Sequence, residues 1–140
     1  MQLPRLSFPW KQFHAVGVRW IVCLCSEHPR YDPAPLRRLA TTELWDLVER
    51  ELPDDPEREE ELIREIANSV VERIEAGEGV VVHCAGGRGR TGTVLGMALR
   101  LMGVSADEIE NRLNHIHQLR GKEGWPESPW QRQVLDRTTV

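Results

Sequence analysis

A cysteine and an arginine stand near the two ends of a glycine-rich segment, HCAGGRGRT, in the second half of the chain. Cys84 and Arg90 are separated by five residues, of which three are glycine. A short apolar run at residues 80–82 leads into this segment, and a helical pattern of apolar residues begins near Arg90. A strand, a glycine loop and a helix in this order direct several backbone N–H groups and a helix N-terminus toward one anion. The pattern therefore predicts a phosphate-binding loop.

The positive field of such a loop also acts on the thiol inside it. We expect this field to lower the pKa of Cys84 from its ordinary value of about 8.5, so that the sulfur is a thiolate nucleophile at neutral pH. Arg90 can bind two phosphate oxygens with its planar guanidinium, a geometry that lysine lacks. A Walker A loop is excluded, because the segment contains no lysine and because Cys84 stands where that motif has its first glycine. The residues expected to line the phosphate are Ala85, Gly86, Gly87, Arg88, Gly89 and Arg90.

The composition indicates one domain, residues 1–140, with its own hydrophobic core. The chain has 140 residues, of which 40% are hydrophobic and 29% are charged. Its net charge of −4 argues against a nucleic-acid or membrane partner, although it allows a local basic pocket. Three cysteines and the absence of a charged-then-apolar leader favour reduced thiols in the cytoplasm, and no apolar run reaches the roughly 20 residues of a membrane span. We expect a cytoplasmic monomer that needs no metal or other cofactor.

Short apolar runs and longer helical patterns alternate along the chain. Residues 18–25 and 80–82 are rich in β-branched side chains and predict buried strands, the second of them central in its sheet. A loop that contains Pro29, Pro33 and Pro35 follows the first strand. Residues 35–52 fit either one helix or a short helix followed by a strand that ends near Leu52, and we favour the second. The alternation implies an α/β domain with a central, mainly parallel sheet flanked by helices, in which ligands bind at the carboxyl ends of the strands.

The helices have recognisable ends and apolar faces. A short helix is expected before residue 17, and the first long helix has Asp54 or Asp55 as its N-cap and Gly77 at its exit. Three more helices follow the glycine loop, and the last two begin with the capping signatures SADE and SPWQ. His115 and His117 are expected at the surface. The residues expected to face the core are Ile63, Ile66, Val70 and Ile74 in the first long helix, Val94, Leu95, Ala98, Leu99 and Met102 in the second, and Ile109, Leu113 and Ile116 in the third.

The segment HCAGGRGRT matches the His-Cys-x5-Arg-Ser/Thr signature of the cysteine-dependent protein tyrosine phosphatase superfamily, and the chain resembles its small dual-specificity branch. Three further segments look like parts of that family: GVRWIVCLCSE like a strand, LPDDP like its acid loop and ESPWQ like its closing glutamine motif. The resemblance implies a dual-specificity-phosphatase-like fold. It also implies metal-independent hydrolysis of phosphomonoesters through a phosphocysteine, on phosphotyrosine and also on phosphoserine or phosphothreonine in proteins or peptides.

The resemblance gives each residue of the signature a role. Cys84 would be the nucleophile that becomes phosphorylated, and Arg90 would bind the phosphoryl oxygens. His83 would orient the loop and help to lower the pKa of the thiol. The hydroxyl of Thr91 would help the thiolate to leave in the second step.

The resemblance also implies a general acid on a separate loop. Asp54, thirty residues before Cys84, stands where the family keeps its aspartate, and Asp55 is the neighbouring candidate. We take Asp54 as the acid and Asp55 as the helix cap. Gln131 would position the attacking water, although a capping box that begins at Ser128 explains it equally well.

Other interpretations of these residues stay open. Arg88, an additional base in the loop, makes a highly charged substrate such as a phosphoinositide or an RNA 5′-phosphate the second enzyme hypothesis. A non-catalytic phosphate-binding module would not need both Cys84 and Arg90. An arsenate-reducing or sulfur-transfer enzyme would need a further thiol, for which Cys25 is the candidate, and Cys25 could also capture oxidised Cys84 in a reversible disulfide. A zinc site is disfavoured, because the adjacent His83 and Cys84 would not converge on one ion.

Overall fold

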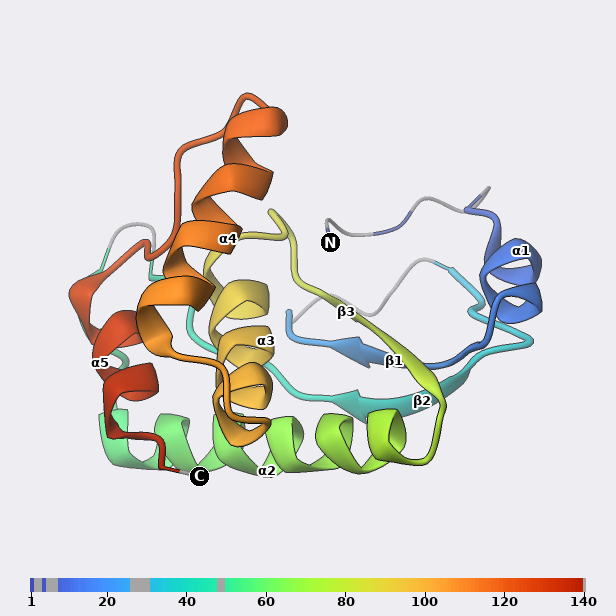
Figure 1. Ribbon diagram of the computed structural model, residues 1–140, viewed down its shortest axis with the longest axis horizontal. Helices are drawn as coiled ribbons and strands as arrows, with labels where there is room; N and C mark the ends of the chain where they lie inside the picture. Colours follow the sequence, from blue (N-terminus) through green and yellow to red (C-terminus); the bar gives the residue numbers. More distant parts are fainter. Residues whose placement is uncertain (2–3, 5–7, 26–30, 48–49, 140) are drawn as a thin grey trace.

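The computed structural model describes residues 1, 4, 8–25, 31–47 and 50–139. In this part of the chain, three parallel strands form one sheet in the order β2-β1-β3 (Figure 1). They are β1 (Val18–Cys23), β2 (Arg37–Thr41) and β3 (Gly79–His83). The predicted parallel sheet is confirmed, and so are the strands expected at residues 18–25 and 80–82. Of the predicted loop, Pro29 lies outside the described residues, whereas Pro33 and Pro35 lie in a loop before β2, as expected.

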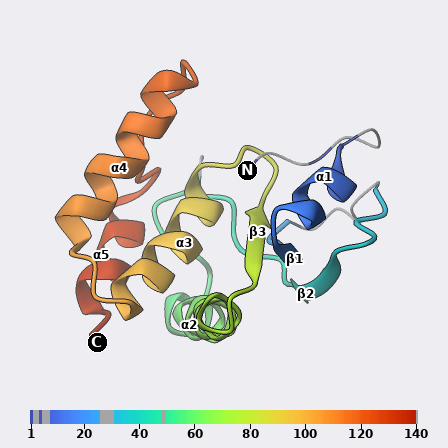
Figure 2. The same cartoon turned by 45° about the vertical axis from the view of Figure 1, so that its right-hand side comes forward.

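Helices cover both faces of the sheet. The short helix α1 (Trp10–Ala15) lies on one side, against β1. On the other side, α2 (Pro56–Glu75) and α3 (Gly89–Leu101) pack against β3, and α4 (Ala106–Leu119) and α5 (Pro129–Arg137) pack against α3 (Figure 2). The α/β architecture predicted from the sequence is therefore confirmed. Among the described residues, no helix is both long and apolar enough to span a membrane.

The alternation of side chains along β1 divides the buried residues into two clusters. Val22 and Leu24 belong to the large core that the sheet forms with α2, α3, α4 and α5. Ile21 points to the opposite face, where it packs in a smaller cluster with Trp10 and Tyr31. A strand buried on both faces reads as a continuous apolar run, which is why β1 was recognisable from the sequence.

The third strand lies at a different place in the sheet from the one predicted. We expected β3 to be central, but it is the last strand of the described sheet, with β1 on one side only. On its outer edge the Met1 main chain accepts a hydrogen bond from the N–H of Cys84 at 3.3 Å and donates one to the carbonyl of Val82 at 2.7 Å. A triplet of valines is buried by helices on the faces of a sheet, so its composition does not distinguish a central strand from an edge strand.

The prediction for residues 35–52 was wrong. Strand β2 (Arg37–Thr41) begins this segment, and the described residues after it form an irregular loop in which Leu44 and Leu47 are buried. The N–H of Thr42 donates to the carbonyl of Cys23, and the N–H of Leu44 donates to that of Leu24, so the loop continues alongside β1. The two leucines are three residues apart, a spacing that imitates a helical face although each is held by the loop.

The helical faces were predicted well except near their C-terminal ends. Ile63, Ile66 and Val70 are buried, as expected, but Ile74, Met102 and Ile116 are exposed by 41%, 46% and 50%. Each of these three lies in the last turns of its helix or just beyond it. The apolar spacing continues to the end of the helix, but the core against which the helix packs does not.

The first turn of α2 provides a test of its cap. The Asp55 carboxylate accepts a hydrogen bond from the N–H of Arg58 at 3.2 Å, while the Asp54 side chain is 63% exposed. We expect Asp55→Ala to lower the free energy of unfolding by about 1 kcal/mol, because an unsatisfied N–H group remains at the helix start. The matched Asp54→Ala should have an effect of at most about 0.5 kcal/mol. Urea unfolding followed by circular dichroism measures both, and equal losses would contradict the assignment of the cap.

Candidate active site

The thiol of Cys84 lies at the carboxyl end of β3, inside the loop that leads into α3. Its side chain is buried, and its sulfur accepts hydrogen bonds from the Gly87 N–H at 3.2 Å and from the Thr91 hydroxyl at 3.1 Å. Burial raises the pKa of Cys84, but the hydrogen bonds from Thr91, the charge of Arg90 and the Gly87 N–H together hold it below its ordinary value. This environment favours the thiolate, the form that acts as a nucleophile.

The direction of the loop N–H groups is fixed from outside by Arg120. The guanidinium of Arg120 donates to the carbonyl oxygens of Gly87 at 3.2 Å and Gly86 at 3.1 Å. Because the C=O and N–H of a trans peptide point in opposite directions, the N–H groups of Gly87 and Arg88 point away from Arg120. Gly87 has a φ of +70°, a conformation that favours glycine. The sequence contained no sign of this role for Arg120, which is far from the signature.

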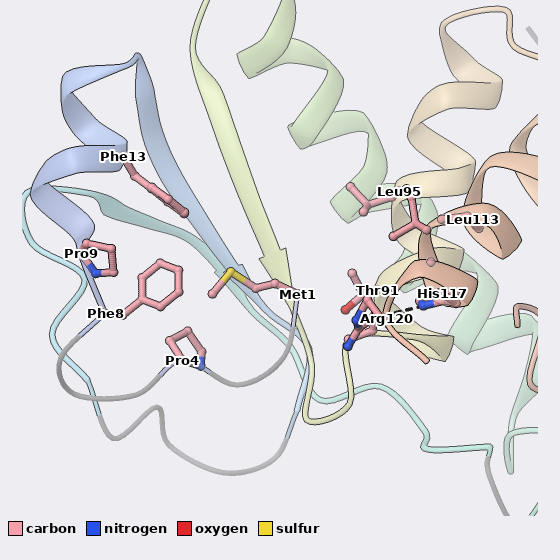
Figure 3. Close-up of a pocket in the computed structure, with 13 residues that line it drawn as sticks. Met1, Pro4, Phe8, Pro9, Phe13, Thr91, Leu95, Leu113, His117 and Arg120 are labelled. Carbon is pink, nitrogen blue, oxygen red and sulfur yellow. Dashed lines mark hydrogen bonds between the residues drawn. The ribbon is translucent and has the colours of Figure 1, made fainter. Parts of the chain in front are cut away.

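Beside Arg120 lies a histidine that we expected at the surface. His117 is buried, and its Nδ1 lies 3.1 Å from the Arg120 guanidinium (Figure 3). Two residues that are two apart on a helix point in very different directions, so when α4 packs on the domain one of His115 and His117 faces inward. His117 therefore belongs to the support of the phosphate loop.

A cavity of about 800 Å³ reaches the loop from the side of the chain start (Figure 3). Its walls are mostly apolar and include Phe8 and Phe13 on one side and Leu95 and Leu113 on the other. Neither Cys84 nor Arg90 is among the lining residues that the structure describes. The cavity is therefore adjacent to the phosphate loop but is not the place where the reacting groups meet.

Arg90 connects the phosphate loop to the loop that follows β2. Its side chain is 11% exposed, and one guanidinium nitrogen donates to the carbonyl of Leu24 at 3.5 Å. A second guanidinium nitrogen lies 3.7 Å from a carboxylate oxygen of Asp46. Asp46 was not identified from the sequence, because the preceding strand was predicted in the wrong place. If β2 had been located from the sequence, an aspartate five residues after its end would have been a candidate site residue, because it follows the carboxyl end of a parallel strand.

The segment around Asp46 is anchored by a buried carboxylate. The N–H of Trp45 donates to Glu59 of α2 at 2.7 Å, and Glu59 is 5% exposed. Burial raises the pKa of Glu59, while the hydrogen bond from Trp45 and the charge of Arg90 act in the opposite direction. Glu59 was also missed, since its place in the acidic run EREEE is typical of a solvated helix face.

The two aspartates identified from the sequence lie at the start of α2. Asp55 caps the helix, as expected. Asp54 forms an exposed ion pair with Arg50, whose guanidinium stacks over the Trp45 ring with its carbon 4.4 Å from the ring centroid. The residue that the structure brings to Arg90 by an ion pair is thus Asp46.

His83 is held by a tyrosine from the loop before β2. The hydroxyl of Tyr31 lies 2.5 Å from Nε2 of His83, and the imidazole is fully buried. Burial lowers the pKa of His83 to about 4, so the ring is neutral at pH 7. His83 thus adds no positive charge beside Cys84, and its contribution to the site is one of position.

Gln131 and Arg88 lie beside the segment at residues 123–128 that leads into α5. The Gln131 carbonyl accepts hydrogen bonds from the N–H groups of Glu127 at 2.8 Å and Ser128 at 3.4 Å, which is a capping role. Its amide nitrogen faces Gly89. A Cβ atom placed on Gly89 would lie 3.0 Å from this nitrogen. The Arg88 guanidinium lies 3.6 Å from the Glu127 carboxylate and 3.8 Å from that of Glu123. The water-positioning role of Gln131 stays a prediction.

Three buried residues beneath the loop have side chains that bind metals. The sulfurs of Cys23 and Cys25 are 3.7 Å apart, and with a ring nitrogen of His83 they lie within 4.8 Å of one another. These ligand types suit a soft ion such as zinc. However, Nε2 of His83 is already bonded to Tyr31, so a metal there would have to replace this hydrogen bond or use Nδ1.

The same geometry bears on the redox hypothesis for Cys25. Strands β1 and β3 are neighbours, as this hypothesis requires. Burial and the hydrogen bond with Cys23 raise the pKa of Cys25 to about 11, so its thiol is protonated at neutral pH. Capture of an oxidised Cys84 by Cys25 stays a prediction, and the protonated thiol makes it slow.

The hydroxyl of Thr91 provides a test of the thiol environment. Thr91→Val removes this donor, so we expect the pKa of Cys84 to rise. Alkylation of Cys84 by iodoacetamide, followed by mass spectrometry, should then reach half its maximal rate at higher pH than in the wild type. Thr91→Ser keeps the hydroxyl and should behave like the wild type. An unchanged midpoint in Thr91→Val would contradict the assignment.

Arg120 provides a test of the loop support. We expect Arg120→Ala to raise the competitive inhibition constant of inorganic phosphate, measured against hydrolysis of a phosphate ester, about tenfold. The reason is that two loop carbonyls lose a charged donor, so the inward N–H groups lose their alignment. Arg112→Ala is the control, since Arg112 lies on the same helix and bonds to Glu108 at its surface. Similar inhibition constants for the two variants would mean that Arg120 does not hold the loop.

Known structures share this architecture. Tk-PTP in its active form is 24% identical, with a TM-score of 0.71, over 98% of this chain and 87% of that one. A putative dual specificity phosphatase from mouse, complexed with zinc tungstate, is 16% identical with a TM-score of 0.70, over 94% and 77% of the two chains. PTPMT1 in complex with PI(5)P is 18% identical with a TM-score of 0.68, over 98% and 86%. These likenesses confirm the dual-specificity-phosphatase-like fold.

Comparison with protein families gives the assignment. No curated protein matches the chain. The family model described as "Swiss Army Knife protein, DSP-PTPase phosphatase domain" matches residues 1–134, which include every element described above except the end of α5. The resemblance found in the signature is thereby confirmed across the domain, and the chain belongs to the PTP-SAK family of DSP-PTPase phosphatase domains.

Proposed function

We propose that this phosphatase domain hydrolyses phosphomonoesters through a phosphocysteine intermediate, on phosphotyrosine and also on phosphoserine or phosphothreonine in proteins. One observation carries the proposal: the buried Cys84 sulfur accepts hydrogen bonds from Gly87 and Thr91 in a loop that ends at Arg90. A binding module would have no need of an activated thiol at the centre of its phosphate loop.

In the first step, the Cys84 thiolate attacks phosphorus. An S–P bond forms and the ester P–O bond breaks, while an acid group donates a proton to the departing oxygen. The inward N–H groups of the loop and the guanidinium of Arg90 stabilise the charge on the phosphoryl oxygens. Because these groups supply the electrostatic stabilisation that metal ions supply in kinases, the mechanism needs no metal.

In the second step, water attacks the phosphocysteine. The S–P bond breaks, inorganic phosphate leaves and the thiolate is restored. The Thr91 hydroxyl, 3.1 Å from the sulfur, stabilises the thiolate as it departs. The Gln131 amide nitrogen, which faces Gly89 at the end of the loop, is the group that would orient this water.

The charge of the loop favours a phosphoprotein over a more highly charged substrate. Arg88 is the base that would bind the additional phosphates of a phosphoinositide or the phosphodiester chain of an RNA. Its guanidinium is already paired with Glu127 and Glu123, at 3.6 and 3.8 Å. We further propose a cytoplasmic monomer whose partners are phosphorylated proteins. The net charge of −4 supports the choice of proteins over nucleic acid or membranes as partners.

The decisive test compares the wild type with Cys84→Ser on a phosphotyrosine peptide in excess EDTA. We expect the wild type to release phosphate and the variant to lose at least about 10⁴-fold of the activity, because a serine hydroxyl is not ionised at neutral pH. Rapid quenching with a ³²P-labelled substrate should trap label on Cys84. Activity in Cys84→Ser, or loss of wild-type activity in EDTA, would contradict the mechanism. Faster turnover of an inositol phosphate than of the peptide would contradict the substrate assignment.

A further inference from the structure

We propose that Asp46 is the general acid of this site. The inference rests on the proposed phosphocysteine mechanism, in which a proton must reach the ester oxygen as it leaves. The sequence suggested Asp54 for this role from its distance to Cys84 along the chain. The structure contains a different aspartate beside the phosphate loop.

The loop of Asp46 lies at the correct edge of the sheet. Hydrogen bonds from the N–H groups of Thr42 and Leu44 to the carbonyls of Cys23 and Leu24 carry the chain along β1 beyond the end of β2. All three strands are parallel, so the carboxyl ends of β1 and β2 lie at the same edge as that of β3, which bears the nucleophile. Ligands of parallel sheets bind at this edge.

The contact with Arg90 brings the carboxylate to the phosphate site. A carboxylate oxygen of Asp46 is 3.7 Å from the guanidinium of Arg90, which in the proposed mechanism binds the phosphoryl oxygens. The Asp46 side chain is 57% exposed, whereas that of Arg90 is 11% exposed, so the carboxylate lies on the open side of the guanidinium. In the proposed mechanism the leaving group of the substrate would project to this open side, next to Asp46.

The neighbours of Asp46 hold its backbone in place. Glu59, buried in α2, accepts the N–H of Trp45 at 2.7 Å. Trp45, Glu59, Arg90 and Gln131 line one small cavity, so this anchor adjoins the phosphate loop directly. Asp54 lies outside this arrangement and binds Arg50, which stacks on the Trp45 ring. Glu59 is thus a positioning residue for the Asp46 loop.

The proton balance is complete with Asp46 alone. In the complex, phosphate oxygens replace the carboxylate as partners of Arg90, and Asp46 in its protonated form faces the leaving oxygen. Its proton moves to that oxygen as the P–O bond breaks, which leaves a carboxylate. The carboxylate then removes a proton from the water that attacks the phosphocysteine, and the acid is restored as phosphate leaves.

The test separates proton donation from folding by the choice of leaving group. Asp46→Asn and the matched Asp54→Asn are assayed on a phosphotyrosine peptide and on 2,4-dinitrophenyl phosphate, whose leaving group needs no proton. We expect Asp46→Asn to lower kcat/KM on the peptide by about 10²-fold or more and to stay within a few-fold of the wild type on the dinitrophenyl ester. Asp54→Asn should stay within a few-fold of the wild type on both.

Each of the other outcomes overturns either the role of Asp46 or the proposed function. An equal loss on both substrates in Asp46→Asn would mean a structural role and would overturn the proposal. A loss confined to the peptide in Asp54→Asn, with Asp46→Asn unaffected, would return the role to Asp54. In both cases, full dependence of the wild type on Cys84 would leave the proposed function intact. A wild type inactive on the dinitrophenyl ester would overturn the proposed function, and the role of Asp46 with it.

Discussion

A thiol that is buried and yet has a lowered pKa places strict demands on the structure around it. Burial alone raises the pKa of Cys84, so hydrogen-bond donors and the charge of Arg90 must stabilise the thiolate in place of water. Gly87 and Thr91 supply two such donors, and both lie on the segment that turns from β3 into α3. The same turn directs N–H groups toward a phosphate, so nucleophile activation and anion binding arise from one local conformation.

That conformation is held by residues remote in the sequence. Arg120, from the end of α4, fixes the carbonyls of Gly86 and Gly87 on the outside of the loop. Tyr31 binds the imidazole of His83 at the end of β3. The Tyr31 hydroxyl gives the buried Nε2 of His83 a hydrogen-bond partner. The contacts of Arg120 also restrain the loop before any substrate arrives, and a preorganised loop needs less reorganisation in the reaction.

The loop after β2 illustrates the difference between spacing along a chain and position in space. LPDDP lies at a family-like distance from Cys84, but its Asp55 is used as the cap of α2 and its Asp54 forms an exposed ion pair. The chain between β2 and α2 is long enough to pass Arg90 first, at Asp46, and only then to enter the helix. A count of residues measures contour length, whereas an ion pair depends on position in space.

The sequence alone determined what is local. Strand, loop and helix around Cys84 follow from nearest-neighbour chemistry, namely three valines and permissive glycines, so this strand-loop-helix arrangement and the parallel α/β fold were predicted correctly. Tertiary structure decided what depends on burial and long-range packing: that His83 is neutral, that Arg120 supports the loop and that Asp46 meets Arg90. Leu44 and Leu47 had the spacing of a helix, and only their packing beside β1 made that segment a loop. The physical reason is that backbone preferences act over a few residues, whereas desolvation and ion pairing depend on which distant segments the core brings together.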